Sequence, residues 1–322
     1  MREREREMAI LQFRILGPLE VIGPDGPVWI DGRKRRALLI ALLTHPNEVV
    51  GVDRLQEWLW PLGPPPHALS TLQAHISLLR RTLEPARSPW KATGVLVTRS
   101  PGYLLHVTPA ELDALCFEDL LRRGREALER GEPGAARPLL CTALDLWRGD
   151  ALADVTMLDA AQAEIRRLEE LRVTATVLRI EADLALGRHL DVVPELTRLI
   201  VAQPLHEQLY ALLMLALCRC GRRADALSVY GRAGDVLRQE MDLEPGPALR
   251  RMRAAVLADP ANCPLSSYSS VSPIASRLSG RMPGALRCGR WAGLYGTPRS
   301  ESDISRVGWA GRPGGRDSGC SG

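Results

Sequence analysis

The chain has 322 residues, of which 45% are hydrophobic and 25% charged, with a formal net charge of +4. This composition is typical of globular proteins, and the length predicts two domains rather than one. The longest apolar runs, residues 37–43 and 210–218, are much shorter than the roughly 20 residues that a transmembrane helix needs. The first residues, MREREREM, lack the apolar segment of a signal peptide, so we expect a cytoplasmic protein with no membrane partner.

Several common reaction chemistries lack their sequence signatures. Neither lysine, Lys34 or Lys91, follows a glycine, which excludes a GxxxxGK[ST] phosphate loop. The chain also has no GxSxG, no HExxH and no GxGxxG that opens a helix after a strand. Cys218 and Cys220 form a C-x-C without a second pair or a nearby histidine, which does not indicate a metal site. We therefore expect no catalytic residues, no cofactor and no metal, and an enzyme is the least favoured class.

The N-terminal region begins with short strands and continues with helices. Residues 12–22 are rich in strand-forming residues, and the turn at residues 23–26 leads to a second strand over 28–30. A helix over 35–43 follows, with a core face of Leu38, Leu39, Leu42 and Leu43. Residues 52–60 form a second helix, and the proline-rich residues 61–66 must form a loop because proline cannot continue a helix.

The third helix, over residues 68–83, is the first feature that points to a function. Its buried face is expected to consist of Leu72, Ile76, Leu79 and Leu83, which follow helical spacing. The opposite face carries small side chains, and longer Gln, His and Arg side chains lie at its flanks. Such a face suits the major groove of DNA, because small residues allow close approach and long donors reach bases and phosphates. An ordinary solvated helix face is an equally good interpretation of this pattern.

Two strands complete this region. Residues 94–98 and 103–107 alternate as strands around Arg99, Ser100, Pro101 and Gly102, which places Arg99 at the tip of a hairpin. Three helices followed by a hairpin is the order of a winged helix-turn-helix, in which the hairpin forms the wing.

The second half of the chain is predicted to be helical throughout. Gly131, Gly187 and Gly221 each follow one helical pattern and precede another, with apolar residues five and nine positions later. The interval from Gly187 to Gly221 is 34 residues, the tetratricopeptide period. The preceding interval of 56 residues predicts at least one additional irregular helix. His189 and His206 stand alone, Asp145, Asp150, Asp154 and Asp159 are interpreted as solvated turn and cap residues, and Trp147 as a core residue.

Charge and composition divide the chain into segments. Residues 1–109 have a net charge of +4, residues 110–260 of −5, and residues 261–322 of +5. Glycine, serine and proline dominate the last segment, which has no apolar periodicity and is predicted to be disordered. We therefore expect a flexible N-terminus (1–10), an α+β N-terminal winged helix-turn-helix (11–109), an all-α tetratricopeptide-like helical repeat domain (110–260), and a disordered C-terminal tail (261–322).

The ordered succession RALLIALL, VDRLQEWLW, TLQAHISLLRRTL and TRSPGYLL resembles the OmpR-type winged helix. More specifically, the chain resembles the Streptomyces antibiotic regulatory protein (SARP) family. The resemblance continues through ALDLWRGDALADV and LEPGPALRRM, which are similar to the bacterial transcriptional activator domain of that family. It covers about residues 11–257 and implies DNA binding and transcriptional activation.

The resemblance also implies which residues bind DNA. On the third helix, the positions that match the family's contacts are Ser70, Thr71, Gln73, His75, Ser77, Arg80 and Arg81. In the wing they are Arg99 and Tyr103, and at the end of the second helix Trp60. Leu78 and Leu104 stand where the family usually has arginine. The basic cluster at residues 33–36 opens the first helix, which the resemblance places away from DNA, with phosphate contact as the alternative.

By this resemblance, the partners are double-stranded DNA at promoter direct repeats, RNA polymerase, and a second protomer paired on the DNA. The expected function is activation of a secondary-metabolite (antibiotic) biosynthetic gene cluster. The alternative is a helical-repeat interaction scaffold whose winged helix is weakened by Leu78 and Leu104.

Overall fold

The computed structural model describes residues 11–85, 94–154 and 159–258. The first part of the chain contains two small sheets and the helices between them: β1 (Gln12–Arg14), β2 (Glu20–Gly23), β3 (Gly26–Pro27), α2 (Arg33–Leu43), β4 (Val50–Gly51), α3 (Val52–Leu59), α4 (Ala68–Leu83), β5 (Leu96–Arg99) and β6 (Gly102–Leu105). The second part is helical: α5 (Asp113–Glu129), α6 (Pro133–Asp145), α7 (Asp159–Ala185), α8 (His189–Ala202), α9 (Glu207–Arg219), α10 (Arg223–Met241) and α11 (Pro247–Ala258). The predicted flexible N-terminus and disordered tail lie outside the described residues.

The first part is a winged helix-turn-helix, as predicted. The strands β1, β2 and β3 form one antiparallel sheet, and β4, β6 and β5 form the second in that order. Helix α4 has the predicted bounds, and its apolar stripe of Leu72, Ile76, Leu79 and Leu83 is buried. The strand expected over residues 28–30 is wrong, because β3 ends at Pro27 and only the N–H of Val28 still donates to the sheet, at Val21 O (2.8 Å).

The second part is an all-α repeat domain, which confirms the prediction. Gly131, Gly187 and Gly221 each lie between two helices and adopt positive φ angles of 74°, 81° and 76°. A residue with a Cβ adopts a positive φ only at a cost in steric strain, so glycine at these turns lets one helix end and the next begin. The structure thus gives a physical reason for the spacing of the three glycines.

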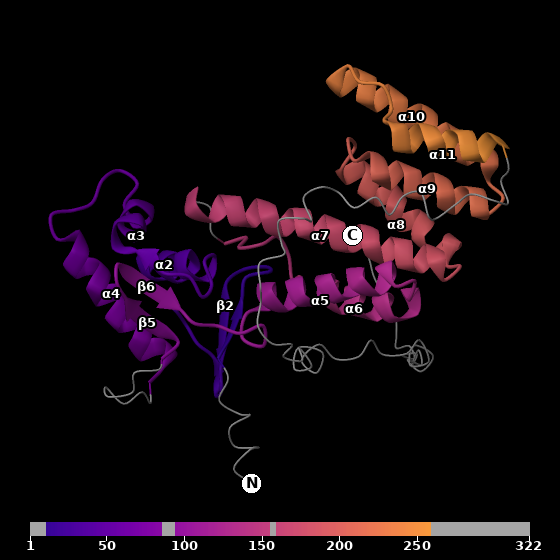
Figure 1. The fold of residues 1–322 in the computed structure, drawn as a ribbon. Coiled ribbons are helices and arrows are strands. Elements are labelled where there is room, and N and C mark those ends of the chain that lie inside the picture. The colour runs from indigo at the N-terminus through magenta and orange to yellow at the C-terminus, as the bar shows by residue number, and fades with distance from the viewer. Residues whose placement is uncertain (1–10, 86–93, 155–158, 259–322) are drawn as a thin grey trace, which may run out of the picture.

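The additional helix expected between Gly131 and Gly187 is not found in the described residues. That interval contains α6 and α7, just as the following interval contains α8 and α9. The extra length instead comes from a longer connection after α6 and from α7, which has 27 residues where α9 has 13. In Figure 1, α7 runs from beside the winged helix to the stack of α8–α11.

One hydrophobic core connects the winged helix to the first helices of the repeat domain. The cluster of buried residues extends from Leu11 through Leu112 to Ala175, across the boundary expected near residue 109. A second cluster, from Val177 to Val256, fills the rest of the repeat domain. None of the described helices is long and apolar enough to cross a membrane.

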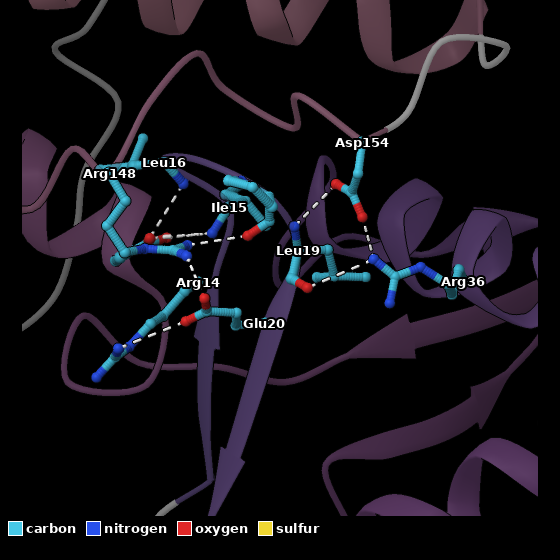
Figure 2. Close-up of polar contacts among 10 residues, drawn as sticks. Arg14, Ile15, Leu16, Leu19, Glu20, Arg36, Arg148 and Asp154 are labelled. Carbon is cyan, nitrogen blue, oxygen red and sulfur yellow. Dashed lines mark hydrogen bonds and ion pairs between the residues drawn. The ribbon is translucent and has the colours of Figure 1, made fainter. Parts of the chain in front are cut away.

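Polar contacts reinforce the junction between the two parts, as Figure 2 shows. The N–H of Ile15 donates to both carboxylate oxygens of Asp113 (2.9 and 3.0 Å), at the start of α5, and the N–H of Leu16 donates to one of them (3.0 Å). Arg148 forms an ion pair with Glu20 at 2.8 Å and donates to the carbonyl oxygen of Pro18 at 3.0 Å. These contacts fix the N-terminal sheet against the helical domain.

Asp154 has a different role from the one predicted. It was expected to be a solvated turn residue, but its Oδ1 accepts a hydrogen bond from the N–H of Leu19 (2.9 Å) and its Oδ2 pairs with Arg36 of α2. Both contacts join the connection after α6 to the winged helix, as Figure 2 shows. The expectation for Asp154 is therefore wrong, because a carboxylate with two partners far away in sequence is a structural bridge.

Candidate nucleic-acid interface

The exposed face of α4 is the centre of the candidate interface. Ser70, Ala74, Ser77 and Arg81 follow helical spacing on the side opposite the buried leucines, and all four are exposed. The helix contains no acidic residue, and its last turn carries Arg80 and Arg81. The result is an uncovered face with short side chains in its middle and a cation toward its C-terminal end.

Polar side chains at the flanks of this face differ in whether their hydrogen-bonding groups are free to contact a partner. Gln73 is exposed, so its amide is open to a partner. The hydroxyls of Ser70 and Thr71 donate to the carbonyl oxygen of His67, at 3.0 and 2.9 Å. Both hydroxyls are therefore already engaged at the first turn of the helix.

Arg80 connects α4 to the wing. Its Nε donates to the carbonyl oxygen of Leu96 (2.9 Å) and its Nη2 to the hydroxyl of Thr98 (2.7 Å). The guanidinium also lies 5.9 Å from the centre of the Tyr103 ring, and Tyr103 is buried with 6% exposure. These two predicted DNA contacts thus hold the hairpin against α4.

His75 lies at the edge of the interface, half-buried. Its Nδ1 is buried and has no hydrogen-bond partner in the described part of the chain. Burial lowers the pKa of His75, and the positive charges of Arg35 and Lys34 lower it further. Burial and these charges thus favour the neutral imidazole, and the start of α2 lies within electrostatic range of α4.

Two members of the basic cluster at residues 33–36 contact different parts of the protein. Arg36 pairs with Asp154 at the domain junction. Lys34 instead reaches the end of α3, where its ammonium donates to the carbonyl oxygen of Leu59 and lies 5.2 Å from the centre of the Trp60 ring. Trp60, the predicted backbone contact at this end, is half-buried.

Among the described residues of the wing, Arg99 is the cation that lies at its tip. Arg99 is exposed at the end of β5, as expected for the tip of the hairpin. The two leucines that replace expected arginines are not equivalent: Leu78 is 40% exposed, as predicted, whereas Leu104 is buried with 9% exposure. Leu104 therefore contributes to packing, and only Leu78 lies on the surface where a cation is expected.

The described residues contain no group of three or more His, Cys, Asp or Glu side chains placed to hold a metal ion. The candidate interface comprises the exposed face of α4, the Arg99 cation of the wing and the junction between α2 and α3.

Comparisons with known proteins agree with this arrangement. Residues 31–105 match the family described as "Transcriptional regulatory protein, C terminal", and residues 112–257 match the "Bacterial transcriptional activator domain". The chain is 40% identical over 254 residues to the regulatory protein DnrI of Streptomyces peucetius, an alignment that covers 78% of this chain and 93% of that protein. The chain belongs to the Streptomyces antibiotic regulatory protein (SARP) family.

Other relatives are longer than the region they share with this SARP-family chain. It is 36% identical over 285 residues to the regulatory protein AfsR of Streptomyces coelicolor, which covers 88% of this chain but 28% of that protein. Identity to the transcriptional regulator RedD of the same organism is 35% over 248 residues, 77% of this chain and 71% of that protein. The solved structure of Mycobacterium tuberculosis EmbR in complex with a low-affinity phosphopeptide matches with a TM-score of 0.74 and 31% identity, over 80% of this chain and 68% of that one.

Two contacts of this SARP-family chain could not be predicted from its sequence. The role of Asp154 depends on Arg36, 118 residues away, and no local pattern connects them. The contact of Lys34 with Trp60 joins the start of one helix to the end of the next, two sites far apart in the sequence, so no local pattern indicates it either.

Proposed function

We propose that this chain is a sequence-specific DNA-binding transcriptional activator. Its winged helix, residues 11–109, binds promoter DNA with α4 in the major groove. The observation that carries this proposal is the uncovered face of α4, with the exposed series Ser70, Ala74, Ser77 and Arg81 and no acidic residue in the helix. The major groove admits one α-helix, and short side chains on its leading face allow the backbone to approach the bases.

The geometry supports different roles for the individual side chains. Gln73 is the candidate for base recognition, because a carboxamide pairs in a bidentate manner with adenine. Arg81 and Arg99 are exposed cations that suit phosphates or a narrow minor groove. Arg80 and Tyr103 position the wing against α4, through the bonds to β5 described above.

Membership in the family supports the remaining elements of the proposal. The protomers pair on promoter direct repeats, contact RNA polymerase and activate a secondary-metabolite gene cluster. The helical domain, residues 110–260, provides self-association, since stacked helix pairs present extended surfaces for protein partners. The shared core and the polar junction make the orientation of the winged helix relative to that domain a fixed property of each protomer.

A second candidate function rests on Leu78. An exposed leucine on the DNA-reading face, where the family resemblance leads us to expect a cation, favours a protein-interaction scaffold with weakened DNA binding.

Fluorescence anisotropy with the full chain separates the two candidates. The probes are duplex promoter DNA from the protein's own gene neighbourhood and a scrambled duplex of equal length and composition. The activator should prefer the promoter by about 10³-fold or more at physiological salt. Equal binding of both duplexes, or none, would support the scaffold instead.

A further inference from the structure

Lys34 occupies an unusual position for a surface lysine. It lies in the first turn of α2, and its ammonium is held at the C-terminal end of α3 by the carbonyl oxygen of Leu59 and by the face of Trp60. A lysine side chain ordinarily loses much of its rotamer freedom when a partner fixes it. Two contacts within the protein already restrict Lys34, so a bound anion would meet a preorganised cation.

The ammonium of Lys34 keeps binding capacity for a partner. It has three N–H donors, and Leu59 takes one of them. The residue is exposed, and no carboxylate among the described residues lies within ion-pair distance of it. Arg36, two residues later, shows the contrast, because its charge is matched by Asp154 at the domain junction.

The location of Lys34 relates it to the DNA-binding face. Trp60 ends the helix that precedes α4, and His75 in the middle of α4 experiences the positive charges of Lys34 and Arg35. The two phosphate backbones form the walls of the major groove, so a helix that lies in the groove has phosphates on both of its sides. A cation beside the recognition helix, at the end of the preceding helix, is therefore placed to meet that wall.

We propose that Lys34 and Trp60 together form a clamp for one DNA backbone phosphate that flanks the groove occupied by α4. The ammonium of Lys34 donates to a phosphate oxygen, and the Trp60 ring fixes the ammonium in place. This assigns the start of α2 to the DNA interface. The inference rests on the proposed function of the chain.

Salt-dependent binding of the full chain tests the clamp. Anisotropy titrations with promoter and scrambled duplexes are run between 50 and 200 mM KCl for wild type, Lys34→Gln, Lys34→Met and Lys34→Arg. Loss of one phosphate contact reduces the slope of log K against log salt by about 0.9. The affinity ratio of wild type to Lys34→Gln should then fall about 3.5-fold over this salt range, on both duplexes alike. Lys34→Arg should retain the wild-type slope.

Arg251→Gln is the matched control, because it removes the same charge from an exposed position on α11. Thermal unfolding of every variant gives a readout of folding, and Lys34→Met retains the apolar stem over Trp60. A wild-type slope in Lys34→Gln and Lys34→Met, with or without a lower Tm, would overturn the clamp and leave Lys34 as a structural contact. Absence of promoter preference in the wild type would instead refute the proposed function itself.

Discussion

Gly102 is the residue at which a single methyl group should do the most damage to the winged helix. It pairs with Gly51 in the short ladder between β4 and β6, which also contains the pair of Val50 and Tyr103. A Cβ on Gly102 would lie 1.8 Å from the carbonyl oxygen of Val50 and 2.8 Å from the Cα of Gly51. Both atoms belong to the backbone, so no side-chain rotation relieves the clash.

Gly102→Ala must therefore separate β4 from β6 by more than 1 Å. Overpacking costs about 1–3 kcal/mol, and the backbone hydrogen bonds of this short ladder contribute about 1 kcal/mol each. We expect a loss of about 3–5 kcal/mol in the free energy of unfolding of the winged helix. Since β4 leads directly into α3, the wing would also lose its attachment to the helices, and DNA binding should weaken.

The matched control is Gly51→Ala, on the partner residue of the same ladder. A Cβ there meets no atom within 4 Å, and its φ of −63° and ψ of 149° are open to any residue. Its replacement should cost less than about 1 kcal/mol, the scale of an N-cap substitution. Urea denaturation followed by tryptophan fluorescence and circular dichroism measures both variants. Equal unfolding midpoints for the two variants would refute the steric reasoning.

Three further predictions concern charged or exposed residues. Burial raises the pKa of Asp113 from 3.8 to about 6, so the folded chain binds an extra proton between these values. Its contribution to the free energy of unfolding should fall by about 2 kcal/mol as pH rises from 4 to 6. Asp113→Asn, followed by urea denaturation across this range, should lack this component, and parallel pH profiles for the variant and wild type would contradict the prediction. Asp183→Ala removes a buried carboxylate that pairs with Arg137 at 2.5 Å and with Arg179 at 2.8 Å, and should cost about 3 kcal/mol in the same assay. The exposed Asp235→Ala should cost less than about 1 kcal/mol, and similar losses for the two variants would disprove the reasoning. Leu78→Arg adds a cation to the exposed face of α4 and should steepen the slope of log K against log salt for DNA binding by about 0.9. If this variant unfolded instead, Leu78 would be a core residue.

The local elements were predictable because their signals are local. The stripe from Leu72 to Leu83 repeats with helical spacing, and burial of that stripe gives α4 its bounds. The glycines at 131, 187 and 221 mark turns because each requires a positive φ. The same helical spacing correctly placed Leu78 on the surface.

The contacts that determine the roles of individual site residues were not predictable. The pattern of α4 places Arg80 at the flank of the exposed face and Arg81 on it, but it does not indicate that β5 binds the Arg80 guanidinium. Leu104 lies in β6, whose residues are all buried, so an alternation of buried and exposed positions along the strand could not predict the burial of Leu104. The Asp113 contacts to the N-terminal sheet connect residues almost 100 positions apart, where only tertiary packing decides the partner.

Base recognition by Gln73 is the most direct test of the central claim that α4 reads DNA. The measurement is the affinity of wild type, Gln73→Ala and the control Arg251→Ala for the promoter site and for duplexes with each base pair of that site replaced in turn. We expect Gln73→Ala to lose about 1–3 kcal/mol of discrimination at one base position while its affinity for scrambled DNA stays unchanged. A discrimination profile for Gln73→Ala that matches wild type and the control at every position would show that Gln73 on α4 does not read a base.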